Sequence, residues 1–202
     1  MISSAGLSRA QLRRQLRELR RQLPAYQQRQ AAAALRRRLA QHPALRRARH
    51  IALYLPADGE IDPRPLLRQA QRQGRHTYLP VLRRWPSQRM DFQRVLPGEP
   101  LRRNRFGLAE PAPRAARQRP AWTLDLILLP LVGFDARGGR IGMGGGFYDR
   151  SLAYRNRYKN WHKPTIIGLA HACQQVDQLP LSSWDVRLDA VVTPHRWYPA
   201  QR

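Results

Sequence analysis

Residues 126–150 read LILLPLVGFDARGGRIGMGGGFYDR, and this stretch organises the interpretation of the rest of the chain. The apolar run 126–132, which contains one proline, is typical of a strand buried on both faces of a sheet. The turn-rich segment 135–139 follows, then Arg140, and then four glycines within the five positions 142–146. Residues 147–150 begin a predicted helix. The order of strand, glycine loop and helix start favours a phosphate-binding loop.

The residue types in this loop suit phosphate chemistry. Glycines let backbone N–H groups approach an anion, and the first N–H groups of a helix point toward it. Arg140 adds a positively charged fork, and Asp149 adds a carboxylate that can hold Mg²⁺ on the same phosphates. The chain lacks the G-x4-G-K-[ST] signature, and Phe147 stands where G-x-G-x-x-G requires its last glycine. On these residues alone, a flexible surface loop remains the alternative.

Length and composition predict one domain over residues 1–202, large enough to bury a core. No apolar run is long enough for a membrane span or a signal peptide. The single cysteine, Cys173, cannot form an internal disulfide. We therefore expect a cytoplasmic protein without a membrane partner.

The formal net charge of +24 raises the alternative of a nucleic-acid-binding protein. The basic residues are almost all arginines, since Lys159 and Lys163 are the only lysines, and they are spread along the chain. No helix-turn-helix, RNP or zinc-finger pattern accompanies them. The positive electrostatic field of these arginines would equally favour a polyanionic small ligand such as ATP. The charge permits nucleic-acid binding and does not establish it.

The N-terminal third predicts a helical pair and the start of a sheet. Ser8 and Gln11 form a capping box for a helix whose leucines recur at helical spacing until Pro24. A second helix spans 25–41 and is closed by Pro43. A strand at 50–55, a helix from 62 to 74 and a strand at 76–82 follow. This alternation predicts an α/β fold with a mainly parallel, Rossmann-like sheet flanked by helices.

The remainder continues the pattern. We predict strands at 90–95, 165–170 and 188–193, a helix from 147 to about 158, and a long loop over 97–121. Glu60 and the glycine loop each follow directly after a strand. In parallel sheets ligands bind beyond the carboxyl ends of the strands, so both are expected to face one crevice.

The string F-D-x-x-G-x-R-[IL]-G-x-G-x-G-[FY]-Y-D-R strongly resembles the signature of the 5-formyltetrahydrofolate cyclo-ligases, or methenyltetrahydrofolate synthetases. Further matches occur in the same order from Arg9 to Pro194. They are the basic pair Arg9 and Arg13, the strand 51–55 followed by 58–62 (DGEID), the LPV of 79–81, the GLAEP of 107–111, and the elements 180–185 and 189–193.

The resemblance implies an activity. Members of this family convert 5-formyltetrahydrofolate to 5,10-methenyltetrahydrofolate with ATP and Mg²⁺, releasing ADP and phosphate. ATP phosphorylates the formyl oxygen, and N10 of the folate then closes the ring as phosphate leaves. Such a transfer is catalysed mostly by positioning and charge neutralisation.

The resemblance also assigns site residues by position. ATP binding falls to Arg9, Arg13, Arg140, Ile141, Gly142, Met143, Gly144, Gly145, Gly146, Phe147 and Tyr148, and catalysis to Arg140 and Tyr148. The folate would contact Leu55, Glu60, Phe106, Phe147 and Tyr148, with Glu60 on the amino-pyrimidine edge of the pterin. Mg²⁺ would be held by Asp149 and Asp185.

Two departures from the family pattern matter. Some relatives carry a basic residue within the glycine loop, where this chain has Met143 and Gly145, and others have Lys at the position of Arg9. The expected partners are ATP and 5-formyltetrahydrofolate, with or without a polyglutamate tail, and we expect a monomer that does not bind specific nucleic acids. Another ATP-dependent enzyme of this fold acting on a different heterocycle remains the second alternative.

Overall fold

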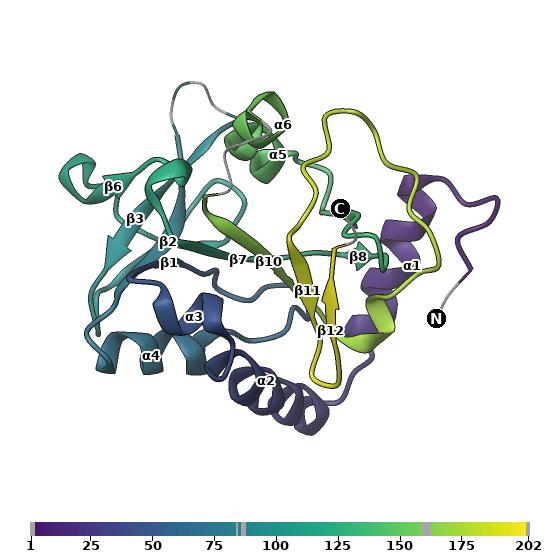
Figure 1. The fold of residues 1–202 in the computed structure, drawn as a ribbon, viewed down its shortest axis with the longest axis horizontal. Helices are drawn as coiled ribbons and strands as arrows, with labels where there is room; N and C mark the ends of the chain where they lie inside the picture. The colour runs from purple at the N-terminus through teal and green to yellow at the C-terminus, as the bar shows by residue number, and fades with distance from the viewer. Residues whose placement is uncertain (1–2, 84, 86–87, 159–162, 201–202) are drawn as a thin grey trace.

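The structure is a computed structural model that describes residues 3–83, 85, 88–158 and 163–200, and it is built on one main sheet with helices on both faces (Figure 1). Helices α2, α3 and α4 cover one face, and α5 and α6 lie on the other. The helices are α1 (Arg9–Arg21), α2 (Ala25–Ala40), α3 (Pro43–Arg47), α4 (Arg64–Arg72), α5 (Phe147–Leu152) and α6 (Tyr154–Arg157), with 3-10 turns η1 (Ala115–Arg117), η2 (Ala121–Thr123) and η3 (Ala172–Gln174). Among the described residues, no helix combines the length and apolar character needed to cross a membrane.

The main sheet has eight strands in the order β12-β11-β10-β7-β1-β2-β3-β6. Its inner strands β11, β10, β7, β1 and β2 are parallel, whereas β12, β3 and β6 pair antiparallel at the edges. This confirms the predicted α/β fold with a mainly parallel sheet. The strands are β1 (His50–Ala52), β2 (His76–Leu82), β3 (Met90–Val95), β6 (Gln118–Arg119), β7 (Leu126–Pro130), β10 (Thr165–Leu169), β11 (Ala190–Val192) and β12 (Trp197–Pro199).

Strand β7 lies at the centre of the core, and its leucines and isoleucine alternate between the two faces. Leu126 and Leu128 pack with residues of α2, α3 and α4, while Ile127 and Leu129 pack toward α5. All four side chains are fully buried. Burial of alternate residues on opposite faces explains why this run is continuously apolar.

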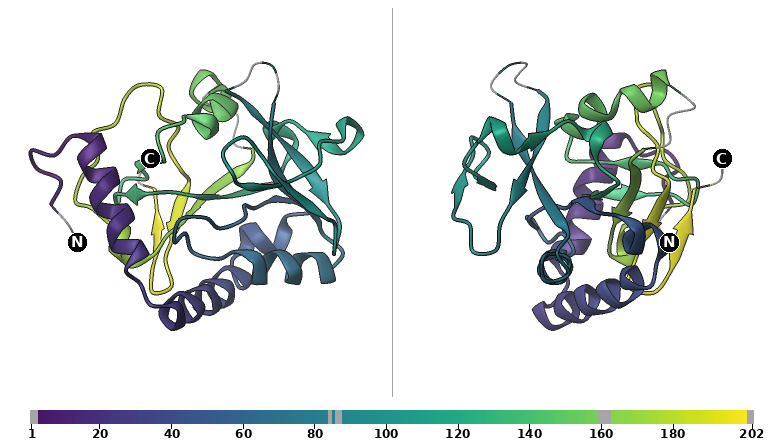
Figure 2. Two further views of the ribbon diagram at one scale, coloured as in Figure 1. Left: turned by 180° about the vertical axis from the view of Figure 1, so that it is seen from behind. Right: turned by 60° about the vertical axis from the view of Figure 1, so that its left-hand side comes forward.

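Helix α1 lies apart from α2, beside the carboxyl ends of the parallel strands (Figures 1 and 2). The predicted capping box of Ser8 and Gln11 is confirmed, and Leu12 and Leu16 are fully buried beside Val132 and Ile141. The buried stripe then continues through Arg20 and not through Leu19, which is exposed. Helix α1 therefore delivers its arginines to the edge of the sheet where ligands are expected.

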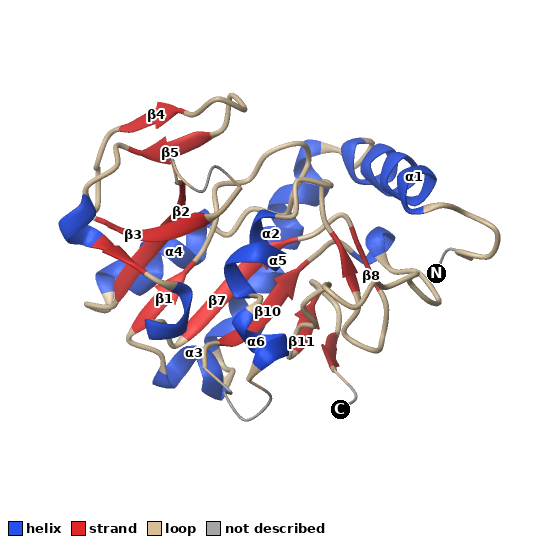
Figure 3. Cartoon of the chain, turned by 90° about the horizontal axis from the view of Figure 1, so that it is seen from above, coloured by secondary structure: helices blue, strands red, loops and turns tan. Residues whose placement is uncertain are grey.

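Several predicted boundaries were wrong. Pro43 begins α3, with His42 as its N-cap, and does not merely close α2. The predicted strand 50–55 ends at Ala52, and the predicted helix from 147 is divided into α5 and α6. The segment 97–121 is not one long loop. It contains η1, β6 and a separate hairpin of β4 (Leu101–Arg103) and β5 (Ala109–Pro111), which stands beyond β2 and β3 (Figure 3).

Candidate active site

The glycine loop leaves the sheet through a second small hairpin, β8 (Gly133–Phe134) and β9 (Arg140–Ile141). Buried Asp135 holds this hairpin by accepting hydrogen bonds from the N–H groups of Gly139 at 2.8 Å and Leu179 at 3.1 Å. Residues 142–146 then run to α5. Gly144 has φ +103° and Gly146 has φ +62°, so the loop uses backbone conformations that side chains disfavour.

Two arginines from different elements converge on this loop. Arg13 of α1 donates from Nε to the Gly142 carbonyl at 2.9 Å. A Cβ atom at Gly144 would lie 3.8 Å from the guanidinium carbon of Arg13. Arg140 is only 4% exposed and donates from Nη2 to Oδ1 of Asp149 at 2.6 Å, while its buried Nε has no partner among the described residues. A buried donor without a partner is costly unless a ligand completes it.

A second arginine–carboxylate pair lies beside the first. Arg9 makes a bidentate pair with Asp185, at 2.6 Å and 3.1 Å, and the Ser182 N–H also donates to Asp185. Burial alone would raise the pKa of Asp185, but these hydrogen bonds outweigh it and lower the pKa. The Val186 N–H donates to Oδ1 of Asp149 at 3.1 Å, which brings the two carboxylate positions together.

Glu60 lies on the loop that follows β1, the neighbour of β7 in the sheet. Its Oε2 accepts from the Ala57 N–H at 3.1 Å, and its side chain is 11% exposed. Burial raises the pKa of Glu60 to about 7, against the lowering effect of Arg20. The pKa of Tyr148 is also raised, first by burial and then by the charge of Glu60, which places the Tyr148 hydroxyl within the electrostatic reach of that carboxylate.

The aromatic slot predicted from the resemblance is partly assembled. Phe106, at the tip of the β4–β5 hairpin, meets Phe147 edge-on with ring centroids 5.6 Å apart. Phe106 is 54% exposed, and Leu55 is partly buried beyond the end of β1. Ile141 differs from the other predicted contacts, because its side chain is buried in the core and its carbonyl accepts from the Val132 N–H. Only its backbone adjoins the loop.

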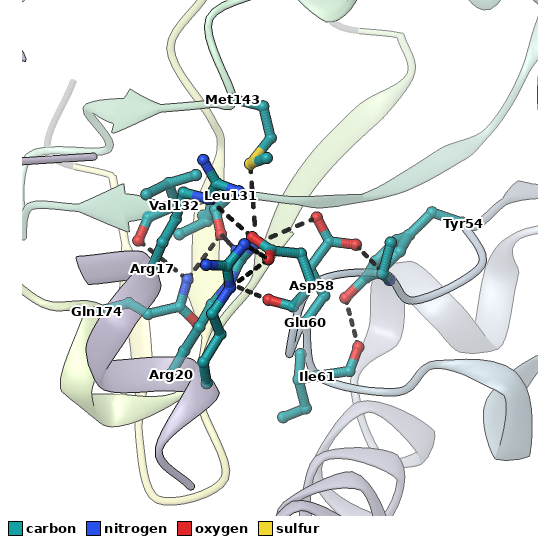
Figure 4. A network of polar contacts seen from close by, with 12 residues as sticks. Arg17, Arg20, Tyr54, Asp58, Glu60, Ile61, Leu131, Val132, Met143 and Gln174 are labelled. Carbon is teal, nitrogen blue, oxygen red and sulfur yellow. Dashed lines mark hydrogen bonds and ion pairs between the residues drawn. The ribbon is translucent and has the colours of Figure 1, made fainter. Parts of the chain in front are cut away.

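Arg20 is not among the site residues predicted from the sequence, although it contacts both the Glu60 loop and the glycine loop. The guanidinium is fully buried and donates to the Leu131 carbonyl at 3.0 Å and to Oδ2 of Asp58 at 2.8 Å (Figure 4). The signal was present, because Arg20 stands four residues after Leu16 and eight after Leu12. Residues at this spacing share one helix face, so Arg20 continues the buried stripe.

The two carboxylates predicted to hold Mg²⁺ are suited to it to different degrees. The hydrogen bonds of Asp149 go to Oδ1, which leaves Oδ2 for a cation, whereas both oxygens of Asp185 are bonded to Arg9. Within the described ranges, no group of three or more His, Cys, Asp or Glu residues could enclose a metal. Mg²⁺ commonly binds through one or two carboxylates together with substrate phosphates, and Asp149 fits that mode.

The fold and the site define a class of protein: an α/β protein that places an arginine-lined glycine loop beside a buried carboxylate at the carboxyl ends of adjacent parallel strands. Arg9, Arg13 and Arg140 outnumber Asp149 and Asp185, which leaves a local excess of positive charge. Such a site suits a polyphosphate next to a polar heterocycle.

Comparison with known proteins identifies the family. Residues 5–194 match the model of the 5-formyltetrahydrofolate cyclo-ligase family. The chain is 41% identical over 182 residues to a 5-formyltetrahydrofolate cyclo-ligase of Haemophilus influenzae, covering 89% of this chain and 94% of the relative. It is 39% identical over 183 residues to the 5-formyltetrahydrofolate cyclo-ligase of Escherichia coli K12, covering 90% of this chain and 97% of the relative. The chain belongs to the 5-formyltetrahydrofolate cyclo-ligase family.

A solved structure agrees in fold. The NMR structure of Aquifex aeolicus 5,10-methenyltetrahydrofolate synthetase superposes with a TM-score of 0.79 at 26% identity, covering 96% of this chain and 93% of the other.

Proposed function

We propose that this protein cyclises 5-formyltetrahydrofolate to 5,10-methenyltetrahydrofolate with consumption of ATP, releasing ADP and phosphate. The observation that carries the proposal is the convergence of Arg13 and buried Arg140 on the glycine loop, beside a loop that presents Glu60. One half of this arrangement suits a polyphosphate, and the other suits a ring with N–H donors. Family membership supports the same reaction.

The nucleotide half consists of the glycine loop and the arginines. Backbone N–H groups of residues 142–146 would face the phosphates, and the unpartnered Nε of Arg140 would donate to a phosphate oxygen. Arg13 and Arg9 would neutralise the remaining charge from α1. Because these groups are fixed before ATP arrives, little reorganisation is needed during phosphoryl transfer.

Asp149 is the better candidate for the metal position, and Asp185 would join it only if the Arg9 pair rearranges. A bound Mg²⁺ would neutralise phosphate charge and fix the geometry of the transferred group. Arg140 holds Asp149 in place for this role, whereas Arg9 occupies both carboxylate oxygens of Asp185.

The folate half consists of Glu60 and the aromatic slot. An ionised carboxylate can accept two parallel N–H bonds from the amino-pyrimidine edge of a pterin. The flat ring would be enclosed by four apolar and aromatic side chains: Phe147 and Tyr148 at the start of α5, Leu55, and Phe106 from the β4–β5 hairpin.

Tyr148 would link the folate half of the site to the nucleotide half. The charges of both Glu60 and Arg140 act on Tyr148, so this side chain is within electrostatic reach of the proposed folate edge and of the proposed phosphate site. Its raised pKa keeps the hydroxyl protonated, so it can donate to the formyl oxygen or to the incoming phosphate. The formyl oxygen attacks the γ-phosphorus as ADP leaves. N10 then attacks the formyl carbon and loses its proton, and phosphate departs with the electrons of the C–O bond.

The test is incubation of the protein with 5-formyltetrahydrofolate and Mg-ATP, following the near-ultraviolet absorbance of the methenyl product and the release of ADP. We expect one ADP for each methenyl group formed, and no product without ATP. An Arg137→Ala variant is a suitable control, because Arg137 is exposed in the same hairpin as Arg140. ATP-dependent turnover of another heterocycle, with none of 5-formyltetrahydrofolate, would contradict the proposal.

A further inference from the structure

A cluster of charged side chains behind the proposed folate site connects α1 to the Glu60 loop (Figure 4). Its centre is the buried guanidinium of Arg20. Nε donates to the Asp58 carbonyl at 2.8 Å, and Nη2 donates to Oδ2 of Asp58 at 2.8 Å. The same Nη2 lies 3.9 Å from Oε1 of Glu60 and 3.8 Å from the sulfur of Met143 in the glycine loop. One side chain therefore contacts both halves of the proposed active site.

Three arginines donate hydrogen bonds to the single carboxylate of Asp58. Arg17 donates to its Oδ2 at 2.8 Å and Arg21 donates to its Oδ1, in addition to Arg20. Although partial burial opposes the change, these three bonds lower the pKa of Asp58 to about 2. Asp58 also adopts φ +52°, a left-handed conformation that costs free energy for most residues other than Gly, Asn and Asp. In this conformation the carboxylate faces all three arginines.

Glu60 is surrounded by groups with opposing effects on its charge. Arg20 of α1 favours the carboxylate, whereas burial and the neighbouring Asp58 favour the neutral acid. Tyr54, after β1, and Tyr148, of α5, also interact with it, and both have raised pKa values. On the outer side of the loop, the groove that includes Glu60 is also lined by charged side chains of α2 and α4 and of the loop itself: Arg29, Arg36, Asp62, Arg64 and Arg68.

The distances decide which group dominates. Nη2 of Arg20 donates to Asp58 at 2.8 Å and lies 3.9 Å from Oε1 of Glu60. Because the closer carboxylate interacts more strongly with the guanidinium, Asp58 weakens the effect by which Arg20 stabilises the ionised form of Glu60. Removing the charge of Asp58 would release Arg20 toward Glu60. Removing the charge of Arg20 would leave Glu60 buried beside a second carboxylate. Loss of the Asp58 charge should therefore lower the pKa of Glu60, and loss of the Arg20 charge should raise it.

We propose that Arg20 and Asp58 are positioning residues that jointly set the charge of Glu60 and thereby determine which heterocycle edge the site accepts. The inference rests on the proposed function, because it assumes that Glu60 contacts the substrate ring. Ionised Glu60 accepts two N–H bonds, which selects an amino-pyrimidine edge. Protonated Glu60 presents one donor and one acceptor, which selects a ring carbonyl beside an N–H. The balance between Arg20 and Asp58 therefore acts as a specificity determinant.

The decisive experiment titrates the Glu60 carboxyl in the ligand-free protein by ¹³C NMR, with the signal assigned through Glu60→Gln. Asp58→Asn is expected to lower the pKa of Glu60 by about one pH unit, since asparagine tolerates the same backbone conformation and only the charge is removed. Arg20→Gln is expected to raise that pKa by about one to three pH units. Arg20→Lys should restore most of the wild-type value. Arg21→Gln is the matched control, because Arg21 contacts Asp58 from an exposed position, and its effect should stay below about 0.3 pH units.

The same variants are then assayed for the pH dependence of KM for 5-formyltetrahydrofolate and for ATP. The folate KM should follow the measured pKa in each variant, while the ATP KM should not. A merely structural role for Arg20 would lower stability without opposite pKa changes in the two variants. If Arg20→Gln does not fold, Asp58→Asn decides alone.

The outcomes separate the inference from the proposed function. A Glu60 pKa that is unchanged in Asp58→Asn, or that moves in the same direction in Asp58→Asn and Arg20→Gln, would overturn the inference. Opposite pKa changes without any response of the folate KM would instead overturn the proposed role of Glu60 in binding the ring.

Discussion

Replacement of Arg140 by alanine tests the nucleotide half of the site most directly. Arg140 is nearly fully buried, holds Asp149 through Nη2 at 2.6 Å, and keeps a buried Nε without a partner among the described residues. If that Nε donates to ATP, the variant loses a charge-assisted hydrogen bond to phosphate and one positive charge from the loop. We therefore expect a specific defect toward ATP and not toward the folate.

The magnitude follows from the bond that is removed. A hydrogen bond to a charged group contributes about 1.5–3 kcal/mol, and about 1.4 kcal/mol corresponds to a tenfold change, so kcat/KM for ATP should fall about 10- to 150-fold. The free energy of unfolding should fall by only about 1–3 kcal/mol. Asp149 retains the Val186 N–H, and its side chain is 20% exposed, so water replaces part of the lost pair.

The assay measures initial rates of methenyl formation while ATP and 5-formyltetrahydrofolate are varied separately, together with a thermal unfolding curve. Arg140→Lys keeps the charge but loses the planar fork, so it should recover only part of the activity. Arg137→Ala, in the same hairpin, should behave as wild type. The reasoning is refuted if Arg140→Ala leaves kcat/KM for ATP within about threefold of wild type, or if KM for the folate rises as much as KM for ATP.

Three further predictions concern the metal, the folate and the loop. Asp149→Asn should require a higher Mg²⁺ concentration for half-maximal rate, because an amide is a poorer ligand for a hard cation; an unchanged Mg²⁺ dependence would remove Asp149 from the metal site. Glu60→Gln should raise KM for the folate about tenfold or more with little change for ATP. The folded-state pKa of Glu60 is about 7 instead of 4.5, so the contribution of Glu60 to stability should fall as pH rises between these values. Relative to wild type, the variant should therefore gain stability over this range and be more stable at pH 8 by about 2–3 kcal/mol in urea titrations. Gly144→Ala and Gly98→Ala should each lose about 1–2 kcal/mol, since both glycines have positive φ, but only Gly144→Ala should raise KM for ATP.

The fold class was predictable because its signals are local. Hydrophobic periodicity, helix caps and glycine positions depend on residues within a few places of one another, so the helices α1 and α2 and the strands β2, β3 and β7 were found close to their observed positions. The errors fell where tertiary contacts override local preference. The β4–β5 hairpin carries few apolar residues, and edge strand β12 pairs with β11 over only three residues, so neither leaves a clear period in the sequence.

The sequence by itself determined the family, the sheet and the glycine loop, because these follow from short patterns and from motifs in a fixed order. Only the tertiary structure decided which arginine of α1 is buried. Arg17 and Arg20 look alike in an arginine-rich helix, yet Arg17 is partly exposed whereas Arg20 is buried against Asp58, 38 residues further along the chain. The partner of a buried charge is chosen by how helices pack on the sheet, since a charge without a nearby counterion could not be buried there.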